Sequence, residues 1–189
     1  MEHDNPGLWR LLRADIERQR TLFNAPVSRS RIKLAMAMVS PRFAPVLLYR
    51  LAYSMNSIGL KIPARFFSLL NYIVFGLEIA AVCKIGPGLF FPHTQGTVIG
   101  AVSIGANAVI YQGVTLGAKD LDFTYDADHR PVIGNNVVIG AGAKVLGGIT
   151  LDDNVIVAAN SVLLTSMPAN VIAAGMPAKI VKQRARSCE

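Results

Sequence analysis

Residues 133–163 read IGNNVVIGAGAKVLGGITLDDNVIVAANSVL, and this stretch decides the fold. A branched apolar residue recurs in it at every sixth position. Strand alternation has a period of two and helices have a period of 3.6, so a period of six belongs to neither alone. It is typical of a β-helix, whose coil contains three short strands and turns a corner after each one. The six anchors are Ile133, Ile139, Val145, Leu151, Val157 and Leu163.

The same spacing continues towards the N-terminus. One earlier set of anchors is Ile104, Ile110 and Leu116, and a still earlier one is Ile79, Ile85 and Phe91. The six-residue spacing is shifted between these two sets. A segment without anchors then interrupts it before Ile133. We therefore predict a parallel β-helix over residues 79–178 with a loop at 117–132. Loops that project from a rigid scaffold often carry function.

The first 78 residues have helical spacing instead. Asn5-Pro6, Ser40-Pro41 and Pro63 each precede a run of apolar residues at helical intervals, and proline suits the first turn of a helix. The predicted fold class is therefore mainly β: a β-helix with an N-terminal α-helical cap at residues 1–78 that covers its open end. Residues 179–189 are predicted to form a basic C-terminal tail.

Composition excludes disorder and leaves the partner of the basic charge open. Of the 189 residues, 52% are hydrophobic and 16% charged, which suits one domain with a sizeable core. The net charge is +7, and residues 1–78 carry 11 basic and 5 acidic side chains, or +6. Such an excess permits contact with an anionic membrane surface, but no recognition motif for nucleic acid accompanies it. The cap cations considered for this contact are Arg29, Arg31, Lys33, Arg42 and Arg50.

Cysteine content and the N-terminal sequence indicate a cytoplasmic protein. Only Cys83 and Cys188 occur, and the start MEHDNPGLWR lacks the pattern of a signal peptide. The apolar window 66–83 approaches the length of a membrane span, but it contains Glu78, which is costly near the middle of a bilayer. We expect no transmembrane helix, and peripheral contact with the inner membrane face stays open.

Five ordered segments carry a resemblance to a known family. They are WRLLRADIER, GLEIAAVCKIGPGLFFPHTQGTVIG, YQGVTLGAK, VIGAGAKVLGGITL and AAGMPAKIV. Together they are similar to the hexapeptide-repeat acyltransferases, in the serine acetyltransferase branch with its relatives that acetylate exopolysaccharide sugars. The resemblance implies a left-handed parallel β-helix, a homotrimer, and acetyl-CoA as cosubstrate in grooves between neighbouring β-helices. Whether trimers pair stays open.

The resemblance assigns catalysis to His93 and Glu78. His93 occupies the position of the general base, and Glu78, fifteen residues earlier, that of the acidic residue that orients it. Such a pair suits the chemistry, because a hydroxyl is a weak nucleophile, imidazole titrates near neutral pH, and a carboxylate fixes its tautomer. A coil of roughly 18 residues, with ~3.3 Å per residue, places the two within reach of one another.

Acceptor recognition is implied for Pro92, His129 and Arg130, and all three depart from the serine-specific pattern. Those enzymes carry an acidic residue at the position of Pro92 and the order Arg-His at the position of His129-Arg130. Without that carboxylate, the ammonium group of serine needs another counter-ion. Acidic residues of the loop, which otherwise form a solvated turn, are candidates: Asp120, Asp122, Asp126 and Asp128. These departures favour a saccharide hydroxyl as acceptor, with serine as the alternative.

Small residues and C-terminal cations are the candidates for binding acetyl-CoA. A pantetheine arm needs a narrow slot and its phosphates need cations, although small residues also suit tight β-helix corners. The slot candidates are Gly117, Ala118, Ala141, Gly142, Ala159 and Gly175, and the phosphate candidates are Lys179 and Lys182.

Two functions of other classes compete with acetyl transfer. A zinc hydratase on the same fold would need three histidine ligands, and the chain has only His3, His93 and His129, so no metal is expected. The other is a non-catalytic module that assembles or binds a membrane surface through the basic cap.

Overall fold

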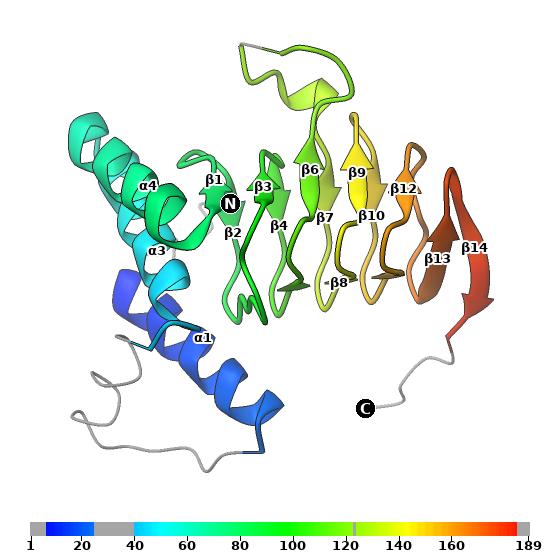
Figure 1. Ribbon diagram of the computed structural model, residues 1–189, viewed down its shortest axis with the longest axis horizontal. Coiled ribbons are helices and arrows are strands. Elements are labelled where there is room, and N and C mark those ends of the chain that lie inside the picture. Colours follow the sequence, from blue (N-terminus) through cyan, green and yellow to red (C-terminus); the bar gives the residue numbers. More distant parts are fainter. Residues whose placement is uncertain (1–6, 25–39, 123, 185–189) are drawn as a thin grey trace, which may run out of the picture.

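Helices gather at one end of a prism of short strands (Figure 1). The computed structural model describes residues 7–24, 40–122 and 124–184. The helices of the cap are α1 (Leu8–Leu22), α3 (Ala44–Ser57) and α4 (Lys61–Phe75). Pro45 lies in the first turn of α3, where a missing N–H costs nothing, and Gly76 ends α4 in the left-handed conformation.

Three sheets, parallel except for the last strand of the third, form the faces of the prism. The first contains β1 (Leu77–Ile79), β3 (Thr97–Ile99), β6 (Thr115–Gly117), β9 (Lys144–Leu146) and β12 (Val162–Leu163). The second contains β2 (Lys84–Ile85), β4 (Ser103–Ile104), β7 (Val132–Ile133) and β10 (Thr150–Leu151). The third contains β5 (Val109–Ile110), β8 (Val138–Ile139), β11 (Ile156–Val157), β13 (Val171–Gly175) and β14 (Ala178–Gln183). The chain visits the three sheets in turn, which confirms the predicted β-helix.

The anchors of the six-residue period form the core. Each of them, from Ile79 to Leu163, is at most 5% exposed. Strand registers stack them directly: Ile85 pairs with Ile104, Ile104 with Ile133, and Leu151 with Ile133. The apolar columns predicted from the sequence are therefore continuous along the prism.

Corners of the prism use residues that tolerate positive φ. Asn107, Asn136, Asn154 and Asn170 stack at the corner between the second and third sheets, with φ between 55° and 62°. Only glycine, asparagine and aspartate adopt this conformation readily. The side-chain amides also pair along the column, and Asn107 donates to Asn136 at 3.1 Å.

Element boundaries differ from the predicted ones at the start of the β-helix and in the C-terminal tail. The helical region ends at Phe75, and β1 already begins at Leu77. Part of the expected tail is strand β14, which runs antiparallel to β13 and closes the far end of the prism. Leu77 pairs with Thr97, so the first coil contains twenty residues, which explains the slip in the six-residue register.

The cap holds one of its cations in the interior. Arg50 is 1% exposed, so it is unavailable to a membrane surface and that expectation for Arg50 was wrong. Arg42 is exposed, while Arg29, Arg31 and Lys33 lie outside the described residues. In the part of the chain that the structure describes, no helix has the length and apolarity needed to cross a membrane.

Candidate active site

The predicted site residues lie at two different corners of the prism. The His93 corner consists of the turns that lead from the third sheet into the first, at residues 92–96, 111–114, 140–143 and 158–161. The loop corner consists of the turns that lead from the first sheet into the second, and it includes the long loop at 118–131. The first sheet separates the two corners within one chain.

A ladder of backbone hydrogen bonds holds the His93 corner together. Gly113 donates to the Gln95 carbonyl at 3.0 Å, and Gly142 donates to the Gln112 carbonyl at 2.9 Å. Asn160 in turn donates to the Ala141 carbonyl at 2.8 Å. His93 therefore lies at the cap end of the same column that carries Ala141, Gly142 and Ala159. Three of the predicted slot residues share this corner with the predicted base.

An apolar cavity of about 310 Å³ contains His93. The end of α1 covers it, because the ring of Phe23 packs edge-on against Phe90 with the centroids 5.8 Å apart. The guanidinium of Arg42 lies 4.9 Å from the Phe23 ring centroid. The cavity is lined by Leu22, Phe23, Arg42, Phe90, Pro92, His93, Val109 and Tyr111. It has one cation and no carboxylate among these residues.

The sequence alone does not predict most of the residues that line this cavity. Phe23 and Arg42 come from the cap, and only its docking onto the β-helix brings them to His93, whereas Tyr111 reaches it through the stacking of the next coil. Phe23 directly follows the apolar face of α1, which was the one signal that it would reach the β-helix.

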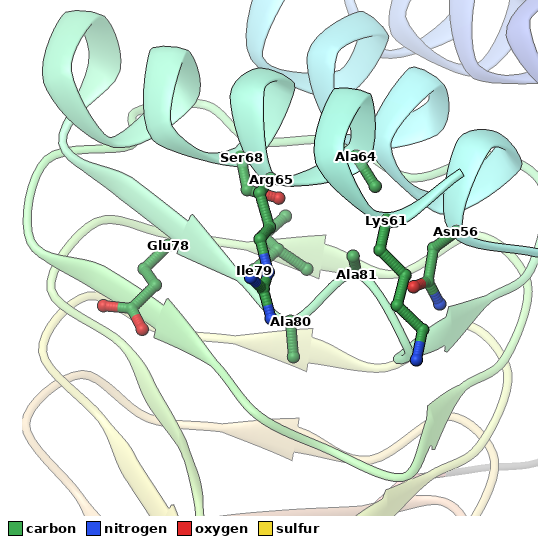
Figure 2. Close-up of a pocket in the computed structure, with 9 residues that line it drawn as sticks. All are labelled: Asn56, Lys61, Ala64, Arg65, Ser68, Glu78, Ile79, Ala80 and Ala81. Carbon is green, nitrogen blue, oxygen red and sulfur yellow. The ribbon is translucent and has the colours of Figure 1, made fainter. Parts of the chain in front are cut away.

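Glu78 lies on β1, outside the cavity of His93. Its side chain is exposed and lines a different cavity, of about 420 Å³, between α4 and β1. Figure 2 shows its carboxylate on the side of that cavity remote from Lys61 and Asn56. Glu78 on β1 pairs with Val98 on β3. His93 lies five residues before Val98, in the turn that leads into β3. Among the described residues, no hydrogen bond or ion pair joins Glu78 to His93, so the expected contact is absent in the single chain.

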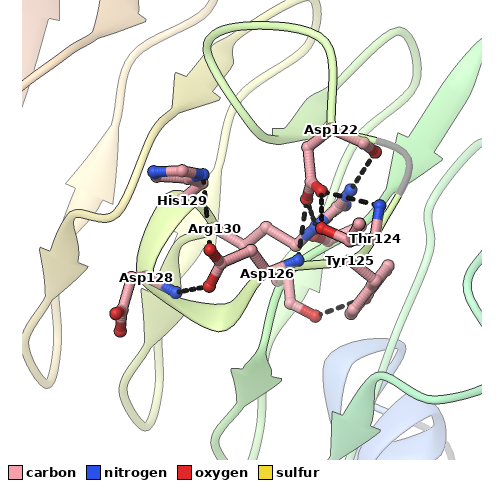
Figure 3. A network of polar contacts seen from close by, with 9 residues as sticks. Asp122, Thr124, Tyr125, Asp126, Asp128, His129 and Arg130 are labelled. Carbon is pink, nitrogen blue, oxygen red and sulfur yellow. Dashed lines mark hydrogen bonds and ion pairs between the residues drawn. The ribbon is translucent and has the colours of Figure 1, made fainter.

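Arg130 is committed to holding its own loop. It donates to the Asp122 carboxylate at 2.8 Å and to the carbonyls of Gly100 and Asp122 (Figure 3). Its guanidinium also stacks on the Tyr125 ring, 3.9 Å from the centroid. All these contacts are made inside the chain. They leave the Arg130 side chain little freedom for the acceptor binding that the resemblance implied. Its role in the structure is to fold the loop onto the β-helix.

His129 stays available at the loop corner. It lies in a short 3₁₀ turn (Ala127–His129), with its Nδ1 3.7 Å from a carboxylate oxygen of Asp126. A cavity of about 280 Å³ lies beside it, lined by Lys119, Asp120, Leu121, Asp122, His129, Gly147 and Gly148. Of the acidic loop residues, Asp122 is held by Arg130, whereas Asp120 and Asp128 are exposed.

The predicted acetyl-CoA residues divide between the two corners as well. Gly117 and Ala118 begin the loop corner, while Gly175 extends the His93 corner and donates to the Ser161 hydroxyl at 3.2 Å. Lys179 and Lys182 are exposed on β14, beside that end of the column. No cluster of three side chains able to hold a metal ion occurs in the described ranges.

Comparison with known proteins places the chain in a family. Residues 130–165 match the model of the bacterial transferase hexapeptide, a unit of six repeats. A serine acetyltransferase of Helicobacter pylori is 38% identical over 164 residues, which cover 86% of this chain and 93% of that protein. The chain belongs to the serine acetyltransferase family. A second family member, from Staphylococcus epidermidis, is 44% identical over 126 residues, which cover 66% of this chain and 58% of that protein.

Solved structures of serine acetyltransferases are similar to this structure over nearly the whole chain. The enzyme of Brucella abortus, determined with coenzyme A, has a TM-score of 0.80 and 31% identity, covering 96% of this chain and 70% of that one. The enzyme of Neisseria gonorrhoeae has a TM-score of 0.80 and 27% identity, covering 95% and 68%. As a member of the serine acetyltransferase family, the chain is an acyltransferase with a left-handed β-helix, as predicted. These relatives favour the serine alternative over the saccharide acceptor.

Proposed function

We propose that the chain is an acetyl-CoA-dependent O-acetyltransferase with L-serine as its acceptor. The observation that carries this proposal is the Helicobacter pylori serine acetyltransferase, which matches over 93% of its own length. The structure of the Brucella abortus enzyme with coenzyme A supports the cosubstrate. The imidazole of His93, which lines the cavity at this corner, supplies the base that such a reaction needs.

In the proposed reaction, His93 removes the proton of the acceptor hydroxyl as its oxygen attacks the thioester carbonyl. A carbon–oxygen bond forms, and backbone N–H groups stabilise the negative charge of the tetrahedral intermediate. The carbon–sulfur bond then breaks, and the proton held by His93 passes to the leaving thiolate. The products are the acetyl ester and coenzyme A, and no acyl group is carried by the protein.

We place this site between two copies of the chain. His93, Ala141 and Gly142 lie at one corner, whereas Gly117 and His129 lie at the other, beyond the first sheet. One copy cannot enclose a ligand with both sets. In a homotrimer of parallel prisms, the His93 corner of one copy faces the loop corner of the next, and a groove between them holds both. Glu78 then acts from the first sheet, at the edge of that groove.

A saccharide hydroxyl is the second candidate acceptor, and the His93 cavity is the observation that favours it. Phe23, Phe90 and Tyr111 offer flat apolar faces, which suit the ring of a sugar. The charge of Arg42 does nothing for the ammonium group of serine, and the described residues that line the cavity include no carboxylate. Serine therefore needs its counter-ion from the loop of a neighbouring copy, where Asp120 and Asp128 are exposed.

The decisive experiment measures product formation by mass spectrometry with acetyl-CoA and a panel of acceptors. We expect O-acetylserine from L-serine, and loss of about a hundredfold or more in kcat for His93→Ala. Turnover of sugars with none of serine would overturn the acceptor and leave the reaction class standing. His93→Ala with near wild-type kcat would overturn the assignment of the base.

A further inference from the structure

The outward face of α4 is apolar where a surface helix is normally polar. Ala64 and Asn71 are the residues of α4 that are buried against the protein. On the opposite side lie Ile62, Phe66, Leu69 and Ile73, which are 82%, 59%, 55% and 69% exposed. At 3.6 residues per turn, their spacing of four, three and four residues forms one stripe along the helix. A stripe of this kind marks an interaction site rather than scattered surface residues.

Basic and aromatic residues follow one edge of this stripe. Lys61, Arg65 and Tyr72 recur at spacings of four and seven, and all three are exposed. Neither α3 nor α4 contains an acidic residue. Residues 18–77 contain nine basic and no acidic side chains. Glu78 lines the same cavity as Lys61 and Arg65 without an ion pair to either.

We propose that this face of α4 docks the protein onto an anionic membrane surface. Large apolar side chains in the middle, with cations and a tyrosine along the edge, are what a helix needs to lie in the plane of the lipid headgroups. At 15 residues, α4 is too short to cross a bilayer, so it binds in that plane. Figure 1 shows α4 at the end of the prism remote from β14.

The positive charge of α4 favours a membrane over a second copy of the chain as the partner of the apolar stripe. Two copies packed through this stripe would bring Lys61 and Arg65 close to the same cations of the partner, with no acidic residue on α4 to balance them. Anionic lipid headgroups supply that balance, and each cation near the surface strengthens binding roughly fivefold. Membrane binding is independent of the acetyl transfer proposed above.

Cosedimentation with lipid vesicles tests the proposal. We expect the full chain to bind vesicles of phosphatidylcholine with phosphatidylglycerol, to bind pure phosphatidylcholine far less, and to dissociate as salt is raised. Replacing two stripe residues in Phe66→Ser/Ile73→Ser should weaken binding about tenfold or more. The matched control is Leu121→Ser, which removes an 88% exposed apolar residue from the distant loop and should leave vesicle binding at the wild-type level. Circular dichroism and acetyl transfer by the double variant show whether it is still folded.

Two results would overturn the membrane assignment. One is wild-type protein that stays in the supernatant with every vesicle. The other is a double variant that binds as the wild type does, or that changes only the size of the assembly in light scattering, which would make the stripe a contact between copies.

Discussion

Arg50 and Asp15 form a bidentate ion pair with both side chains fully buried. The nitrogens of Arg50 lie 2.9 and 3.0 Å from the two carboxylate oxygens. Arg50 also donates to the carbonyls of Ile85 and Gly86, and Asp15 accepts from two backbone N–H groups of the first coil, at 2.8 and 2.9 Å. The pair thus joins α1 and α3 to the β-helix.

Removing one partner of this pair should destabilise the fold strongly. Asp15→Ala leaves a guanidinium buried without its counter-charge, and we expect the free energy of unfolding to fall by about 3–5 kcal/mol. The double variant Asp15→Leu/Arg50→Met removes both charges and should lose less than Asp15→Ala. Chemical denaturation of the two variants makes the comparison. A loss under ~1 kcal/mol for Asp15→Ala would mean that the pair does not hold the cap.

The β-helix was predictable because its signal is local and repeated. Every sixth residue faces the interior, so the anchors from Ile79 to Leu163 identify their own columns. The cap offers no such repeat. Arg50 was counted among the surface cations because a charge in a sequence says nothing about a partner 35 residues away. Its burial follows from the way α1 and α3 pack on the first coil.

The site was predictable only where a motif marks it. The resemblance identified His93, and the structure places it at the corner that also carries Ala141, Gly142 and Ala159. The predicted contact between Glu78 and His93 is not made within the single chain, since the prediction assumed a coil of about 18 residues and the first coil has twenty. The aromatic lining of the His93 cavity depends on tertiary packing, and no spacing in the sequence indicates that packing.

The loop at 118–131 should depend on Arg130. Arg130→Lys keeps the positive charge but loses the planar fork that reaches Asp122 and Gly100 together, and it loses the stacking on Tyr125. We expect faster backbone hydrogen exchange at residues 118–131, with the strands of the third sheet unaffected. Lys119→Arg, at an exposed position of the same loop, is the control. Unchanged exchange in Arg130→Lys would show that the loop is held by other contacts.

Asp122 should stay ionised at unusually low pH. Burial alone would raise the pKa of Asp122, but hydrogen bonds from Thr124 and Arg130 outweigh it and lower the pKa to about 2. A carboxyl with a depressed pKa contributes stability above its unfolded pKa, about 3.9, and loses it as the pH falls towards 2. We expect the ¹³C carboxyl resonance of Asp122 to remain that of a carboxylate at pH 3. Titration of Asp122 near pH 4 in the wild type would contradict the network.

Cys83 should be inert in the folded protein. It is fully buried, and burial raises the pKa of its thiol to about 12, so almost no thiolate exists near neutral pH. In a Cys188→Ser variant, we expect a thiol reagent at pH 8 to label no cysteine until denaturant is added. Rapid labelling under native conditions would reopen the question of an acyl group carried on Cys83.

Substitutions at Gly142 and Gly117 distinguish a role in packing from a role in binding acetyl-CoA. Gly142 has φ of +72°, and a Cβ there would collide with the Asn160 side chain, so Gly142→Ala should lower the melting temperature. Gly117 has open space around its Cβ position, so Gly117→Ala should leave the melting temperature unchanged. If Gly117 lines the proposed groove, the added methyl group should raise the KM for acetyl-CoA severalfold with little change in the KM for the acceptor. An unchanged KM for acetyl-CoA would remove Gly117 from the cosubstrate site.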